Sequence, residues 1–168
     1  VALNIHVGNS HRRTNVINDL CWEKMCLSDE FSLENTEKYR PAFHHTPQYG
    51  WMNDPNGMFY HDGVYHLYYQ FNPYGSMWGN MHWGHSSSRD LVNWEHHPVA
   101  IAPDQWGTIF SGSAVVDKDN TAGFGEGAVV AMYTSCSLTQ KQSIAYSLDG
   151  GITFTKYEGN PVVQAPQE

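Results

Sequence analysis

The sequence predicts an all-β protein made of two successive four-stranded units. Eight short segments are rich in β-branched and aromatic residues and are separated by turn signals, and no stretch has a convincing helical period. Features of the first unit recur in the second: the Ser-Arg-Asp at 88–90 matches the Ser-Leu-Asp at 147–149, 59 residues later. The Ala-Pro at 102–103 recurs 63 residues later. Four-stranded units at such a period are typical of propeller blades, with an eight-stranded sandwich as the alternative.

Each pair of expected strands flanks a turn signal, such as Asp62-Gly63 in the first unit and Leu148–Gly151 in the second. We expect strands at 57–61, 64–71, 82–88, 94–101, 112–117, 128–135, 142–147 and 152–157.

Composition excludes several classes of function. The net charge is −8, which argues against a nucleic-acid or anionic-membrane partner and leaves a neutral sugar acceptable. No apolar run approaches the roughly 20 residues of a membrane span. The three cysteines, Cys21, Cys26 and Cys136, form no disulfide framework, and they do not fix the redox compartment.

Residues 1–36 differ in character from the rest. They mix one alternating stretch with polar connections, so we interpret them as the tail of a preceding module or a linker, with a disordered leader as the alternative. Residues 37–168 carry the strand pattern and are expected to be one propeller portion. The chain begins with Val and shows no signal peptide, and we expect it to be a piece of a longer protein.

One stretch concentrates the chemistry, Trp51-Met52-Asn53-Asp54-Pro55-Asn56-Gly57. Pro55 restricts the backbone of Asp54, and Asn56-Gly57 is a turn pair, so we expect the chain to bend just after the carboxylate. A positioned acid beside amides and an indole suits sugar chemistry, which needs a nucleophile and donors for ring hydroxyls. Asp-Pro-Asn-Gly alone would be an ordinary surface turn.

The motifs on either side of this stretch decide between a sugar site and an ordinary surface turn. The stretch is preceded by His-Thr-Pro at 45–47 and followed by Tyr-Tyr-Gln-Phe-Asn-Pro at 68–73, Trp-Gly-Asn-Met-His-Trp-Gly-His at 78–85 and Ile-Phe-Ser-Gly-Ser at 109–113. In this order and spacing the motifs resemble glycoside hydrolase family 32, which contains invertases, inulinases, levanases and fructan exohydrolases. The resemblance runs from about Tyr39 to the end of the chain.

The resemblance implies a five-bladed β-propeller, of which this chain holds about the first two blades, and no cofactor. It implies that Asp54 is the nucleophile of a retaining β-fructofuranosidase acting on sucrose or on fructans such as inulin and levan. It also implies a fructosyl pocket lined by Trp51, Met52, Asn53, Gln70, Trp78, Phe110 and Ser111, and a secreted, periplasmic or cell-surface location.

These residue types fit that role physically. The amide of Gln70 can donate to and accept from vicinal hydroxyls, and Asn53 is an expected donor beside Asp54. The indoles of Trp51 and Trp78 offer flat apolar faces to sugar C–H groups. Without the resemblance, a solvated strand end for Gln70 and core positions for the tryptophans are the plainer interpretations.

Other chemistries find little support. His82 and His85 lie an odd number of residues apart on one expected strand, so their side chains should face opposite sides, and we expect no metal site. We expect His45 to brace the pocket through hydrogen bonds. No nucleophile elbow, phosphate-binding loop or dinucleotide fingerprint is present.

Two family motifs do not occur in the sequence, the Arg-Asp-Pro string and the Glu-Cys that carries the general acid/base. We therefore expect this polypeptide by itself to have no useful hydrolytic activity, since general acid catalysis contributes about 10²–10⁴-fold. The alternatives are a fructan-binding propeller without catalysis and a related five-bladed glycosidase acting on arabinan. The sequence leaves open linkage preference, exo or endo action and oligomeric state.

Overall fold

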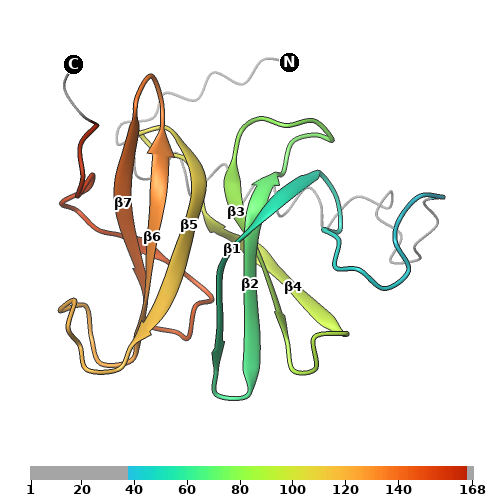
Figure 1. The fold of residues 1–168 in the computed structure, drawn as a ribbon, viewed down its shortest axis with the longest axis horizontal. Helices are drawn as coiled ribbons and strands as arrows, with labels where there is room; N and C mark the ends of the chain where they lie inside the picture. The colour runs from blue at the N-terminus through green and yellow to red at the C-terminus, as the bar shows by residue number, and fades with distance from the viewer. Residues whose placement is uncertain (1–37, 166–168) are drawn as a thin grey trace, which may run out of the picture.

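Eight strands form two antiparallel four-stranded sheets in the computed structural model, which describes residues 38–165 (Figure 1). The first sheet has the order β1-β2-β3-β4 and the second the order β5-β6-β7-β8, so each is a simple meander. The strands are β1 Trp51–His61, β2 Val64–Asn72, β3 His82–Ser88, β4 Trp94–Ile101, β5 Thr108–Asp117, β6 Ala128–Cys136, β7 Gln140–Ser147 and β8 Thr155–Lys156.

The first sheet begins with the expected hairpin. Asp62 and Gly63 both have positive φ, 49° and 79°, and they connect the pair His61↔Val64. A two-residue turn with positive φ at both positions matches the right-handed twist of the strands, which is why Asp-Gly is favoured there. The sequence prediction of this hairpin is confirmed.

Most expected strands agree with the structure to within a few residues, and two differ. β1 begins at Trp51 instead of residue 57, so the stretch that was expected to bend the chain is part of a strand. The last strand contains only Thr155 and Lys156, because Ile152 and Thr153 fold back onto Asp149. Both backbone N–H groups donate to the Asp149 carboxylate, which keeps them out of the ladder.

The main core lies between the two sheets. Its fully buried members include Tyr68 and Trp83 from the first sheet and Ile109 and Tyr133 from the second. The Tyr68 hydroxyl donates to Gly151 O at 2.6 Å, so this buried polar group is satisfied by the loop between β7 and β8.

The inner strands β1 and β5 make the principal contact between the sheets (Figure 1). Two meanders that meet along their first strands have the arrangement of successive propeller blades, not of the two stacked faces of a sandwich. The expected all-β, propeller-type architecture is therefore confirmed for these two sheets.

A second apolar cluster covers the opposite face of the first sheet. Leu67, Tyr69 and Phe71 form it, with Tyr49 and Met52 packed against them. The alternation along β2 explains both cores, because Tyr68 and Gln70 face the second sheet while their neighbours face away from it.

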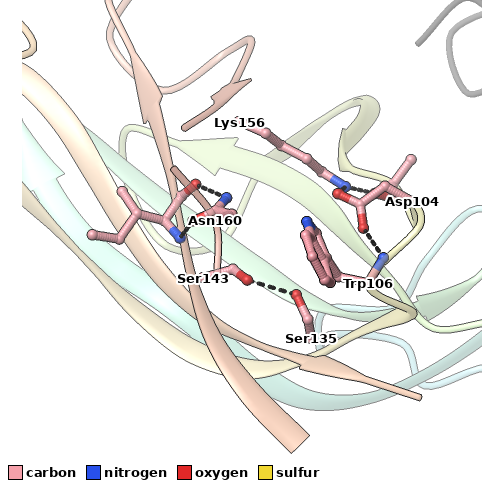
Figure 2. A network of polar contacts seen from close by, with 8 residues as sticks. Asp104, Trp106, Ser135, Ser143, Lys156 and Asn160 are labelled. Carbon is pink, nitrogen blue, oxygen red and sulfur yellow. Dashed lines mark hydrogen bonds and ion pairs between the residues drawn. The ribbon is translucent and has the colours of Figure 1, made fainter. Parts of the chain in front are cut away.

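The segment between the two sheets is fixed by a polar network (Figure 2). The Lys156 ammonium lies 2.7 Å from Asp104 Oδ2, and Asp104 Oδ1 accepts from the backbone N–H of Trp106 at 2.8 Å. Lys156 also donates to Ala102 O. The Lys156 ammonium on the last strand thereby binds Ala102 and Asp104 in the connection that leads into β5, and Asp104 in turn holds Trp106.

The expectation for residues 1–36 lies outside the described residues. Within residues 38–165, no helix has the length and apolar character that a membrane crossing requires.

Candidate active site

Asp54 lies in a break of the β1–β2 ladder. The register passes from Met52↔Phe71 to Pro55↔Tyr69, so Asn53 and Asp54 together oppose the single residue between those partners, Gln70. An extra residue on one strand is a β-bulge, which bends the strand and re-aims a side chain. The carboxylate of Asp54 is exposed as a result.

Ser111 lies in a corresponding break on β5. The register passes from Phe110↔Thr134 to Gly112↔Tyr133, which leaves Ser111 as the extra residue. The Ser111 hydroxyl donates to Asp54 Oδ2 at 2.9 Å. The two bulges therefore aim a carboxylate and a hydroxyl at each other across the boundary between the sheets.

Asn56 stabilises this boundary through two hydrogen bonds of its side chain. Its side chain is 2% exposed, its Nδ2 donates to Asp54 O at 3.2 Å, and its Oδ1 accepts from Gly112 N at 3.2 Å. The prediction of a turn at Asn56-Gly57 is wrong, because these bonds hold Asn56 in the strand. Asn56 pairs with Tyr68 in the ladder, and the positive φ of Gly57, 50°, is absorbed by a second register shift instead of a chain reversal.

Asn53 and Trp51 are paired with each other. The indole Nε1 of Trp51 donates to Asn53 Oδ1 at 2.9 Å. This bond occupies the Asn53 carbonyl and leaves its amide group to serve as a donor. Met52 packs against the outer cluster around Phe71, on the face of the sheet opposite to Gln70.

Gln70 has an unusual environment for an amide. Its side chain is 3% exposed, and no group within residues 38–165 accepts a hydrogen bond from its buried Nε2. A buried donor without a partner costs free energy on the order of 1–3 kcal/mol, which a ligand acceptor such as a hydroxyl would offset. Gln70 also opposes the bulge that carries Asp54, so the two residues are neighbours across the β1–β2 ladder.

Trp78 and Phe110 form an aromatic pair next to these polar groups. Their ring centroids are 6.2 Å apart with an interplanar angle of 67°, an edge-to-face arrangement. Trp78 remains 61% exposed, so its indole offers an apolar face to a ligand. Phe110 directly precedes Ser111, which connects the aromatic pair to the carboxylate.

The buried histidines of β3 serve as neutral hydrogen-bonding groups. His82 and His85 are 3% and 0% exposed, and burial lowers the pKa of His82 to about 4 and that of His85 to about 2. His45 bonds to Ser86 on β3 at 2.9 Å and contacts the Trp94 ring, so its bracing acts on the outer strands. Within residues 38–165, no group of three His, Cys, Asp or Glu side chains is arranged to hold a metal ion.

Sequence reasoning missed the part played by Asn56 and Gly112. The signal in the sequence was the glycine that directly follows Ser111. The structure shows why a glycine is needed there, because a Cβ would lie 2.1 Å from Met132 O. Glycine is required where the backbone of a neighbouring strand comes this close, because any side chain would collide with it. The partner of its N–H, Asn56, is 56 residues away and only the fold reveals it.

One all-β unit thus carries a bulge-aimed carboxylate, a buried amide nitrogen without a partner in residues 38–165 and an exposed indole, which are group types that can bind sugars. A family model described as the glycosyl hydrolases family 32 N-terminal domain matches residues 44–168, and a model described as a domain of unknown function (DUF4980) matches residues 1–43. The chain belongs to glycoside hydrolase family 32.

Individual proteins with similar sequences are a levanase and an invertase. The levanase of Bacillus subtilis is 62% identical over 134 residues, which cover 77% of this chain and 20% of the levanase. The invertase of Schwanniomyces occidentalis is 49% identical over 147 residues, covering 81% of this chain and 28% of the invertase. The chain thus spans less than a third of the length of these two relatives.

Solved structures share the fold. The β-fructofuranosidase of Schwanniomyces occidentalis in complex with fructosyl-erythritol matches with a TM-score of 0.70 and 50% identity, covering 74% of this chain and 26% of that structure. The exo-inulinase of Aspergillus awamori matches with a TM-score of 0.74 and 45% identity, covering 80% of this chain and 31% of that structure.

Proposed function

We propose that the full-length protein hydrolyses terminal β-D-fructofuranosyl linkages of sucrose or fructans with retention of configuration. The observation that carries the proposal is the placement of Asp54. Its carboxylate accepts a hydrogen bond from Ser111 at 2.9 Å, and its bulge is opposed in the ladder by Gln70, whose buried Nε2 has no partner within residues 38–165. The names of the relatives, a levanase and an invertase, support the substrate class.

In the proposed mechanism, one Asp54 oxygen attacks the anomeric carbon of the fructosyl unit and the bond to the leaving oxygen breaks. A carboxylic acid outside residues 38–165 protonates that oxygen, and the same group then removes a proton from the water that releases fructose. Ser111 keeps one carboxylate oxygen hydrogen-bonded, which leaves the other free for attack. Gln70 binds ring hydroxyls, and Trp78 with Phe110 contacts the apolar face of the sugar.

We also propose that the 168-residue chain alone does not turn over substrate, because the Glu-Cys string of the family does not occur in it. The resemblance to the family is the basis for proposing a location outside the cytoplasm, with sucrose or a fructan as the ligand.

The test is fructose release from sucrose, inulin and levan by the full-length reading frame, with Asp54→Asn beside it. Asp62→Asn is the matched control, since Asp62 is exposed in the β1–β2 turn at the other end of the strand. Loss of release in Asp54→Asn alone is expected. Wild-type turnover in that variant would contradict the nucleophile assignment.

Two other outcomes identify the alternatives. Binding of fructan by the wild-type protein without any release would favour a non-catalytic fructan-binding propeller. Cleavage of arabinofuranosides in place of fructofuranosides would favour the arabinan-type glycosidase.

A further inference from the structure

The loop between β2 and β3 carries three exposed large side chains. Tyr74, Met77 and Trp78 are 50%, 76% and 61% exposed. Side chains this exposed are held less firmly than buried ones, so hydrogen bonds to the loop backbone should contribute to the order of the loop.

Asn72, the last residue of β2, supplies that order. Its side chain is 5% exposed and uses both ends of the amide on the loop. Oδ1 accepts from the backbone N–H of Tyr74 at 3.0 Å, and Nδ2 donates to the carbonyl of Met77 at 2.8 Å. One buried side chain therefore holds the start and the middle of the loop.

The first residue of β3 holds the other end. His82 Nδ1 is hydrogen-bonded to Asn80 O, and the His82 ring meets the edge of the Tyr74 ring at 5.5 Å. The loop is thus fixed at both strand ends, and the peptide between Met77 and Trp78 lies between the two anchors.

A short path leads from Asn72 to the carboxylate. The peptide plane that contains Met77 O also contains the N of Trp78, so the bond from Asn72 fixes the position from which the indole projects. The indole meets Phe110 at 6.2 Å, and the residue after Phe110 is Ser111, which bonds Asp54.

We infer that Asn72 is a positioning residue of the sugar site, which sets Trp78 against Phe110 through its bond to Met77 O. This inference deepens the proposed function and rests on it. Asn72 touches no reacting atom. It acts through the indole of Trp78, by holding that side chain against Phe110 before the sugar binds. An exposed loop would not otherwise keep the indole in this position.

The test is Asn72→Asp in the full-length protein. This change keeps the acceptor for Tyr74 N and replaces the donor by an oxygen that repels Met77 O. Asn120→Asp is the matched control, since it adds the same charge in the β5–β6 loop, beyond the far end of β5, and retains the acceptor that Asn120 offers to Gly125 N.

Because small misplacements of binding groups are costly, we expect kcat/KM for fructose release to fall by about tenfold or more in Asn72→Asp, mainly through KM. In a Trp78→Ala background the same change should have little further effect, since its route to the substrate is already gone. Full additivity of the two changes would overturn the inference, as would wild-type kinetics in the single variant.

Hydrogen exchange gives a readout that needs no substrate. Asn72→Asp should speed exchange in residues 73–80 and leave residues 89–93 unchanged, and unchanged exchange at 73–80 would overturn the inference. If the wild-type protein releases no fructose, the proposed function fails and the exchange result alone decides whether Asn72 orders the loop. Asn72→Ser, which removes the bond to Met77 O without adding charge, replaces a variant that does not fold.

Discussion

The Ser111 hydroxyl donates to Asp54 Oδ2 at 2.9 Å, and the two residues come from different sheets and are 57 positions apart. Each lies in a register shift of an inner strand, β1 or β5. The contact therefore depends on two bulges and on the packing of one sheet against the other.

Ser111→Ala tests this contact. Removing a hydrogen bond to a charged group costs about 1.5–3 kcal/mol, so kcat/KM of the full-length enzyme should fall about 10- to 100-fold. The control is Ser113→Ala, two residues further along β5 and also exposed. Equal losses in both variants would show that the Asp54 contact has no special part in the effect.

Gly112→Ala should destabilise the pairing of β5 with β6 in the second sheet. A Cβ at this position would lie 2.1 Å from Met132 O and 2.7 Å from Tyr133 Cα, and backbone atoms cannot yield easily. Overpacking of this kind costs about 1–3 kcal/mol or more, measured as a lower urea midpoint. Gly75→Ala is the control, because nothing lies within 4 Å of its Cβ, and a similar loss there would contradict the steric explanation.

Breaking the partly buried ion pair of Figure 2 should be costly. The Lys156 and Asp104 side chains are 25% and 14% exposed, and Lys156→Met leaves the carboxylate without its cation. We expect a loss of about 1–3 kcal/mol in the free energy of unfolding, less than for a fully buried pair. Adding Asp104→Asn should recover part of it, since Asn removes the charge and keeps an acceptor for Trp106 N. A double variant as unstable as Lys156→Met would contradict this account.

Stability should fall on acidification. Burial lowers the pKa of His82 to about 4 and that of His85 to about 2, with His97 and His66 lowering the latter further and Asp149 opposing them. The unfolded chain then binds more protons than the folded one below the ordinary pKa of about 6.5. The stability that these histidines provide is complete above that pH and is lost as the pH falls towards 4, by about 1 kcal/mol per histidine and pH unit.

Thermal unfolding between pH 8 and 4.5 measures this dependence. His85→Gln should reduce the slope of the midpoint against pH, because glutamine does not titrate. Ser143→Ala is the control: it deletes a buried hydroxyl that is hydrogen-bonded to Ser135 Oγ and should lower the midpoint equally at every pH. An unchanged slope in His85→Gln would contradict the assignment of the acid sensitivity to this residue.

The sequence by itself determined the class of fold and predicted which residues form the site. The alternation along β2, the Asp62-Gly63 turn and the recurrence of the four-strand unit are local patterns, and local propensity together with the alternation of faces is enough to produce them. The order of the motifs likewise pointed to Asp54 and Ser111 without any knowledge of their distance.

Only the tertiary structure decided how those residues meet. Asp-Pro-Asn-Gly has the local chemistry of a turn, yet pairing of Asn56 with Tyr68 and the bond from Gly112 N to its side chain hold the stretch in a strand. The extra residues at Asp54 and Ser111 are likewise set by register against β2 and β6, which no nearby residue encodes. Cross-strand contacts outweigh local turn preference here, because the sheet satisfies more backbone groups and buries more apolar surface than an isolated bend.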